Sequence, residues 1–260
     1  MAAVESGHAG RHWRRRLFLG VLCVVVGSAI LVRRQTLIPS GHVQRADGSQ
    51  ARGVHTIQSS TTTGRRGAYY LPTDHESGER PLLVILHGTG GKGTDILVPV
   101  NTIAERKRFI VIAPDSASVT GAWLVEQRSD GASEDYRHVM QCVREVLALP
   151  GVRIDRAHVL IAGFSVGSGA AFYIASREDL FTAFAILHGH VVTAAIGPRR
   201  IRGWLSTGDR DRLRTGESMR ATADHLLRVA GFSDVETRVF SVDHALREAE
   251  LTSLVEWWLQ

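Results

Sequence analysis

The chain has 260 residues, of which 44% are hydrophobic. This length suits one enzyme-sized domain with an appendage and excludes two such domains. The formal charge of +5 suggests a nucleic-acid binder, but residues 1–44 hold six arginines and one acidic residue, and the remainder holds 25 basic and 25 acidic side chains. Because this larger part is neutral, no nucleic-acid partner is expected.

An uncharged run, LFLGVLCVVVGSAILV, occupies residues 17–32 between clusters of arginines. It predicts a membrane segment, although a helix of this length spans only about 24 Å of the ~30 Å hydrocarbon layer. The pair Arg33-Arg34 favours an uncleaved membrane anchor. The alternative interpretation is a signal peptide that is cleaved at the small residues 27–29. Four arginines before the run and two after it orient the following domain to the outside. The protein is thus expected to be membrane-anchored or secreted, with an extracytoplasmic domain.

The chain divides into three parts on this basis. Residues 1–34 are the membrane anchor or signal segment with its basic flanks, residues 35–53 are a polar linker, and residues 54–260 are one folded domain. Cys23 lies in the apolar run and Cys142 in a predicted helix, so no disulfide between them is expected.

Short runs rich in β-branched residues alternate with longer amphipathic stretches from residue 54 onward. This pattern predicts an α/β fold, with a mostly parallel central sheet and helices on both faces. Strands are predicted at Val54–Ser59, Gly67–Leu71, Leu82–Leu86, Phe109–Ala113, His158–Ala162, Ala183–Leu187, Ile201–Thr207 and Val235–Phe240. Helices are predicted at Asp95–Arg106, Glu134–Leu149, Val166–Ser176, Glu217–Val229 and Leu246–Leu259. The polar connection STTTGRRG predicts that the first two strands form an antiparallel hairpin at the sheet edge.

The strongest chemical signal is the sequence GFSVG at residues 163–167, which follows an apolar strand and opens a helix of small residues. A nucleophilic serine on a sharp strand-to-helix turn needs glycine two positions to either side, since larger residues would crowd the turn. The motif predicts that Ser165 is the nucleophile of an acyl-transfer enzyme.

A glycine-rich loop, HGTGG at residues 87–91, directly follows the predicted strand Leu82–Leu86. Two backbone N–H groups at such a place can stabilise the oxyanion that forms during ester hydrolysis. Val166, the residue after the nucleophile, is one expected donor, and Thr89 is the other, with Gly90 as its alternative.

The remaining members of a serine triad follow in the required order. The strand Ile201–Thr207 leads to Asp209 and Asp211, and the strand Val235–Phe240 leads to His244. His244 is therefore the expected base, and either aspartate is a candidate for the acid.

These motifs together resemble an α/β-hydrolase of the group that includes polyhydroxybutyrate depolymerases, feruloyl esterases and related esterases. The resemblance covers residues 64–259 and rests on GRRGAYYLP, HGTGG, IAPDS, GFSVG, STGDRD and DHAL. It implies the α/β-hydrolase fold and a serine esterase that acts through an acyl-enzyme. In this group the acid usually stands three residues after the glycine that ends the strand, which selects Asp211. The group's cysteines are absent here, and Asp243 precedes the histidine where the group often has glycine.

Several other residues are weighed as site candidates. Gly88, Gly90 and His190 are expected to contact the substrate, and His188 either lines the same pocket or has no role. Trp123 and Trp204 are interpreted as packing residues, and His138, His158 and His225 as surface or interface side chains. No metal-ligand spacing and no nucleotide-binding motif occurs, so neither a metal nor a cofactor is expected.

The expected substrate is a small-molecule or polymeric ester. The short connection between residues 187 and 201 leaves no room for a large lid, which favours short-chain or exposed esters. Thioesterase or peptidase activity on the same fold, and a non-catalytic binding module with a hydrolase fold, are the alternatives.

Overall fold

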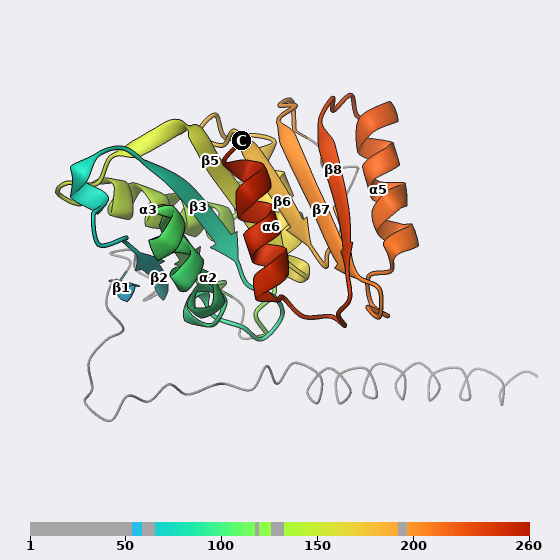
Figure 1. The fold of residues 1–260 in the computed structure, drawn as a ribbon, viewed down its shortest axis with the longest axis horizontal. Coiled ribbons are helices and arrows are strands. Elements are labelled where there is room, and N and C mark those ends of the chain that lie inside the picture. The colour runs from blue at the N-terminus through green and yellow to red at the C-terminus, as the bar shows by residue number, and fades with distance from the viewer. Residues whose placement is uncertain (1–53, 59–65, 118–119, 126–132, 192–196) are drawn as a thin grey trace, which may run out of the picture. The chain divides into compact units, whose positions relative to one another are not determined.

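The computed structural model describes residues 54–58, 66–117, 120–125, 133–191 and 197–260 (Figure 1). The predicted membrane segment at residues 1–34 and the linker at 35–53 lie outside the described residues. Among the helices that are described, none has the length and apolar character needed to cross a bilayer.

One mixed sheet forms the centre of the described part of the chain. Its strand order is β1-β2-β4-β3-β5-β6-β7-β8. The pairs β1–β2 and β2–β4 are antiparallel and all later pairs are parallel, so the predicted edge hairpin and parallel sheet are both present. The strands are β1 (Val54–Gln58), β2 (Arg66–Tyr70), β3 (Arg80–Leu86), β4 (Ile110–Pro114), β5 (Ile154–Phe164), β6 (Ala183–Leu187), β7 (Arg202–Gly208) and β8 (Val235–Phe240).

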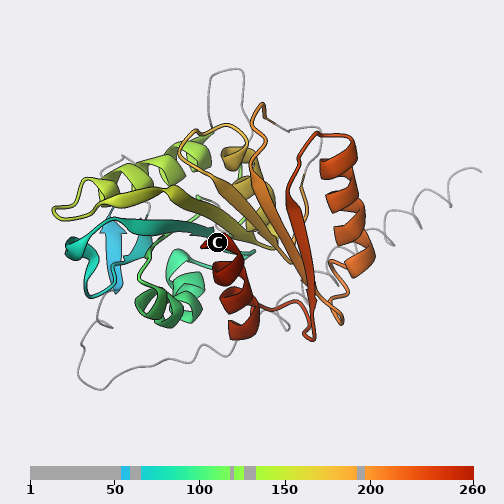
Figure 2. The same ribbon diagram turned by 45° about the horizontal axis from the view of Figure 1, so that its top comes forward.

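Helices cover both faces of this sheet, as the alternating pattern predicts (Figures 1 and 2). One face packs against α2 and α6, and the other packs against α3, α4 and α5. The helices are η1 (His75–Ser77, a 3₁₀ turn), α2 (Gly93–Lys107), α3 (Glu134–Leu147), α4 (Val166–Ala175), α5 (Gly216–Arg228) and α6 (Glu248–Trp258).

The strands at the middle of the sheet are buried on both faces. Residues 159–162 of β5 and residues 82–86 of β3 are each at most 1% exposed, which explains why these strands appear in the sequence as unbroken apolar runs. Strand β5 is longer than predicted and begins at Ile154, because Ile154 pairs with Arg80 of β3 ahead of an irregularity in the register, after which Val159 pairs with Leu82. The parallel strands β3 to β8 all end at one edge of the sheet, and the loops at this edge carry the candidate site.

Candidate active site

Ser165 occupies the turn between β5 and α4. Its backbone has φ 53° and ψ −116°, a conformation that residues other than glycine rarely adopt. The turn is held by a hydrogen bond from the Ser165 N–H to the Leu187 carbonyl at 2.8 Å. Strain of this kind persists only where the surroundings enforce it, and here it presents the serine side chain at the edge of the sheet.

The two glycines of the motif allow the close packing around this turn. A Cβ atom on Gly163 would lie 2.1 Å from the carbonyl oxygen of Gly167, and one on Gly167 would lie 2.6 Å from that of Leu86. Both approaches are far shorter than a carbon atom tolerates, so α4 can approach β5 and β3 only because these positions lack side chains.

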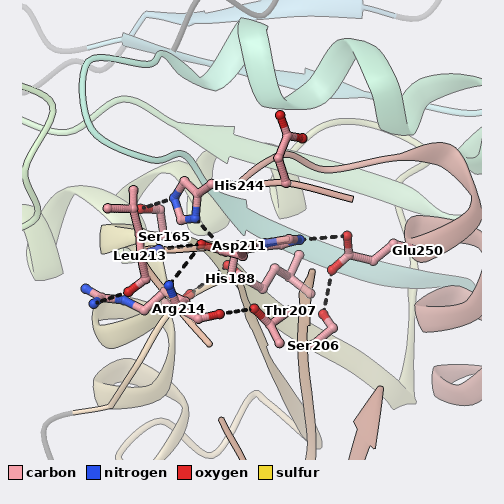
Figure 3. A network of polar contacts seen from close by, with 12 residues as sticks. Ser165, His188, Ser206, Thr207, Asp211, Leu213, Arg214, His244 and Glu250 are labelled. Atoms are coloured by element: carbon pink, nitrogen blue, oxygen red, sulfur yellow. Dashed lines mark hydrogen bonds and ion pairs between the residues drawn. The ribbon is translucent and has the colours of Figure 1, made fainter. Parts of the chain in front are cut away.

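Three residues from separate loops meet at this edge (Figure 3). The Oγ atom of Ser165 lies 3.0 Å from Nε2 of His244, and Nδ1 of His244 lies 2.8 Å from Oδ2 of Asp211. The His244 side chain is 18% exposed, whereas that of Asp211 is fully buried. The structure therefore brings the sequence-predicted serine, histidine and Asp211 into one hydrogen-bonded chain.

Asp211 is satisfied at both carboxylate oxygens. Oδ1 accepts the backbone N–H groups of Leu213 and Arg214 at 2.8 and 2.9 Å, and Oδ2 accepts from His244 and also from His188. Burial alone would raise the pKa of Asp211, but the hydrogen bonds from His244, His188 and Arg214 outweigh it and lower the pKa. The carboxylate is thus held in its charged form.

Asp209, the alternative acid, lies away from the imidazole. Its side chain is 47% exposed, accepts a hydrogen bond from the Ser241 hydroxyl at 3.1 Å and pairs with Arg210 at 3.4 Å. The backbone N–H of Asp209 still bonds to the Phe240 carbonyl of the neighbouring strand, so the chain turns back toward His244 only two residues later.

His188 is a second histidine on the Asp211 carboxylate. Its Nδ1 lies 2.8 Å from Oδ2 of Asp211 and its Nε2 lies 3.2 Å from Oε2 of Glu250. The expectation that His188 could line the pocket is wrong, since its side chain is completely buried between two carboxylates. Burial alone would lower the pKa of His188, but the hydrogen bonds and charges of Glu250 and then Asp211 raise it.

Glu250 was missed in the sequence, although a signal for its position exists. It lies four residues before Leu254 and seven before Trp257, which places it on the buried face of α6. Its side chain is completely buried, and its Oε1 accepts the Ser206 hydroxyl at 2.6 Å. An acidic residue on an apolar helix face needs such partners, because an unpaired buried charge is costly.

The glycine-rich loop after β3 lies beside the nucleophile. A Cβ atom on Gly88 would lie 3.3 Å from Cβ of Ser165. The N–H of Gly90 donates to the Thr120 carbonyl at 2.9 Å, so this alternative oxyanion donor is already engaged. Val166 is the first residue of α4, where a backbone N–H has no acceptor within the helix.

Buried polar contacts hold this loop in place. His87 is 2% exposed, its Nδ1 lies 2.8 Å from the Gly88 carbonyl, and its Nε2 accepts the Ser116 N–H at 3.0 Å. Its own carbonyl accepts the Trp123 indole N–H at 2.9 Å. Burial, the largest effect, lowers the pKa of His87, so its ring is neutral and serves as a fixed structural bridge.

Asp135 fastens the loop that carries Trp123. This residue of α3 is 1% exposed, and its carboxylate accepts the backbone N–H groups of Ala117 and Leu124 at 2.8 and 2.6 Å. An aspartate in the first turn of a helix is common because it complements the helix dipole, so the sequence carries no signal for this additional contact.

The remaining candidates have varied positions. His190 is exposed, and partial burial of its ring and then the charge of Arg214 lower its pKa. Trp204 is buried in the core, as expected. The interpretation of His138 as a surface residue is wrong, because it is 3% exposed and its Nε2 lies 3.0 Å from the Arg66 carbonyl. It shares the buried face of α3 with Cys142, one turn later.

A metal ion could in principle use His188, Asp211 and His244, whose ligand atoms lie within 4.8 Å of one another. Both histidines instead direct Nδ1 at the same oxygen of Asp211, and their Nε2 atoms face Glu250 and Ser165. A metal would have to displace these hydrogen bonds, so the geometry fits a proton-transfer chain better than a ligand set.

Comparisons with solved structures support the fold. The chain is similar to an acetyl xylan esterase from Aspergillus awamori, at 16% identity and a TM-score of 0.61 over 79% of this chain and 98% of that one. It is similar to an S-formylglutathione hydrolase from Staphylococcus aureus, at 16% identity and a TM-score of 0.61 over 80% and 98%. A ferulic acid esterase matches at 17% identity and a TM-score of 0.59 over 78% and 94%. These likenesses show the α/β-hydrolase fold.

A family model provides the assignment to a family. The model described as Esterase PHB depolymerase matches residues 66–202, which are 137 of the 260 residues. The matched region contains Ser165 and His188, and it ends before Asp211 and His244. On this match, the chain belongs to the polyhydroxybutyrate depolymerase family of esterases and is a carboxylic ester hydrolase.

Proposed function

We propose that the protein hydrolyses carboxylic esters through a serine acyl-enzyme, with Ser165 as nucleophile, His244 as general base and Asp211 as the acid of the triad. The observation that supports this most is the continuous contact Ser165 Oγ–His244 Nε2–Asp211 Oδ2, with separations of 3.0 and 2.8 Å, around a serine held in a strained turn. A serine hydroxyl is a weak nucleophile at neutral pH, and an adjacent base supplies the missing activation.

The reaction has two halves. In the first, Ser165 Oγ forms a bond to the carbonyl carbon while His244 Nε2 takes its proton. The tetrahedral oxyanion is stabilised by the backbone N–H groups of Val166 and Thr89, and it collapses as His244 gives the proton to the departing alcohol. In the second half His244 takes a proton from a water molecule that attacks the acyl-enzyme, and it then returns that proton to Ser165 Oγ as the Oγ–acyl bond breaks and the carboxylic acid leaves.

Asp211 supports both halves by its charge and its position. His244 becomes positively charged in each transition state, and a carboxylate 2.8 Å from Nδ1 stabilises that charge and fixes the tautomer that leaves Nε2 free to accept the proton. Because the carboxylate is buried and fully hydrogen-bonded, it does not have to reorganise during the reaction.

The proposed substrates are small or polymeric esters with short acyl groups. Gly88 lies beside Ser165, where an added Cβ would come within 2.9 Å of the Phe164 ring, so only glycine fits next to the nucleophile, and the exposed His190 is the proposed polar contact for the substrate. The N-terminal apolar run motivates the further proposal that the enzyme acts outside the cytoplasm, tethered to a membrane or released from it.

Replacement of the nucleophile tests this function. The variant Ser165→Ala should lose p-nitrophenyl ester hydrolysis and labelling by a fluorophosphonate probe, while its circular dichroism and melting temperature stay at the wild-type values. Ser218→Ala, the same substitution at an exposed serine in α5, is the matched control and should change neither. Wild-type protein that takes no label and hydrolyses no ester would favour a non-catalytic binding module. A series of acyl chain lengths, with thioester counterparts, then defines the preferred bond.

A further inference from the structure

The buried polar chain continues beyond the triad (Figure 3). From Asp211 Oδ2 it passes through His188 to Glu250, and from Glu250 Oε1 to the hydroxyl of Ser206. The side chains of Asp211, His188 and Glu250 are all completely buried. These residues come from the loop after β7, the loop after β6 and the first turn of α6, so only the folded protein assembles them.

The contacts define the charge of His188. Each of its ring nitrogens faces a carboxylate oxygen, Asp211 at 2.8 Å and Glu250 at 3.2 Å. A neutral imidazole has one N–H group, whereas two ionised carboxylates as acceptors require two, so this arrangement favours the imidazolium form of His188. Glu250 is the third residue of α6, where the positive end of the helix dipole favours a negative carboxylate.

The other neighbours of His188 do not offset this charge. The ring of His244 stands at 89° to it with centroids 5.6 Å apart, and the ring of Phe164 lies at 5.7 Å. The chain Asp211, His188 and Glu250 thus carries one net negative charge, which the proton on His244 neutralises in each transition state of the proposed reaction.

The backbone of His188 is strained as well. Its φ is 53°, and only two other non-glycine residues of the described ranges, Ser165 and Arg108, have positive φ. The conformation is maintained by a hydrogen bond from the His188 N–H to the Ser206 carbonyl at 2.8 Å, together with the two ring contacts. A buried charged group in strained backbone contributes little to stability compared with apolar packing, which points to a role in the reaction.

We propose that His188 and Glu250 are positioning residues that fix Asp211 Oδ2 against His244 and moderate the negative charge that His244 experiences. This inference rests on the proposed function. The positive end of the His188–Glu250 pair lies next to Asp211 and its negative end lies farther away. The pair therefore opposes protonation of His244 and extends activity to lower pH.

Two double variants separate position from charge. His188→Asn with Glu250→Gln removes both charges, and the amide nitrogen of asparagine stands the same number of bonds from Cα as Nδ1, so the donor to Asp211 remains. His188→Gly with Glu250→Gln removes the donor as well. Asparagine and glycine both tolerate the left-handed backbone at this position. The control is His158→Asn with Asp155→Asn, a histidine–carboxylate pair of 2.6 Å at the opposite end of β5.

The pH dependence of kcat/KM and the kcat at its plateau are measured for each variant. The Asn/Gln variant should move the acid limb of kcat/KM upward by on the order of one pH unit, since a positive charge near His244 is lost. The Gly/Gln variant should show the same shift and an additional loss in kcat of about tenfold at little change in KM, because Asp211 is no longer held. The His158 control should match the wild type in both.

An unshifted acid limb in the Asn/Gln variant would overturn the charge effect, and equal plateau kcat in both variants would overturn the positioning. Should the variants fail to fold, the ¹⁵N spectrum of histidine-labelled wild-type protein still tests the charge. Both ring nitrogens of His188 should be protonated at pH 7.5, and an unprotonated Nε2 would contradict the proposal. Retained turnover in Ser165→Ala would refute the proposed function instead, so the two failures are distinguishable.

Discussion

The Nδ1 atoms of His188 and His244 both lie 2.8 Å from the same oxygen of Asp211, and the two rings stand nearly perpendicular to each other. A single carboxylate thus contacts the proposed base on one side and a second, fully buried histidine on the other. Because the second histidine is linked to Glu250, the electrostatics of the site depend on a helix that contributes nothing to the triad itself.

The choice between the two aspartates can be tested directly. Asp211→Asn should lower kcat by about 10⁴-fold with the fold intact, because the amide favours the wrong tautomer of His244 and cannot stabilise the imidazolium. Asp209→Asn is the matched control. Its half-exposed carboxylate contacts Ser241 and Arg210 and lies away from His244, so kcat should change by no more than about twofold. Steady-state kinetics that gave the opposite ranking would reverse the assignment.

The glycines around the nucleophile should differ sharply in their tolerance of a methyl group. Gly163→Ala places Cβ 2.1 Å from a backbone oxygen, and we expect a loss of about 3 kcal/mol or more in the free energy of unfolding, or no folded protein. In Gly169→Ala, within α4, the nearest atom lies 3.6 Å away, and the substitution should stabilise the helix by up to about 1 kcal/mol. Urea denaturation measures the free energy of unfolding of both variants. Equal values would mean that the turn around Gly163 has room for a methyl group.

Stability should decline at alkaline pH because of His188. Its pKa is raised in the folded protein, so the native state binds more protons than the unfolded chain above the ordinary histidine pKa of about 6.5. The contribution of His188 to the free energy of unfolding has its full value below pH ~6.5. It decreases by at most ~1.4 kcal/mol per pH unit as the pH rises from there to the pKa of His188 in the folded protein.

Denaturant titrations between pH 6 and 9 measure this slope. The variant with His188→Asn and Glu250→Gln should show a shallower decline than the wild type over the same range. Identical slopes would mean that other groups cause the alkaline loss. At acid pH the opposite sign applies to Asp211, whose lowered pKa stabilises the fold above the ordinary aspartate pKa and ceases to do so as the pH falls through the folded value.

Removal of residues 1–40 should separate membrane association from catalysis. The apolar run at residues 17–32 lies in this segment, so the shortened protein is expected in the soluble fraction with wild-type kcat/KM. Fractionation of cells that produce the two forms makes the comparison. If the protein produced from the complete sequence were recovered in solution with a new N-terminus near Ile30, the segment would be a cleaved signal peptide and not an anchor.

Features that depend on residues close together in the chain could be predicted from the amino-acid sequence. Apolar runs of a fixed length form the buried strands, and the glycines at positions 163 and 167 reveal a turn that no other residue type permits. Ser165 follows β5, Asp211 follows β7 and His244 follows β8. Because these strands are parallel, the loops that follow them lie at the same edge of the sheet. The preference for Asp211 over Asp209 came from the resemblance to a known group, in which the acid stands three residues after the glycine that ends the strand, here Gly208.

The polar residues that face one another across that edge could be identified only from the folded protein. Glu250 is 62 residues from His188 along the chain, and no local pattern relates a histidine in a loop to a glutamate on an apolar helix face. His138 was misjudged for the same reason, because its burial depends on how α3 packs against the sheet and on the carbonyl of Arg66, 72 residues earlier. Hydrogen bonds between buried side chains join segments that are distant in the chain. They are stronger in the protein interior than in water, and an unpaired polar group is costly only once it is buried.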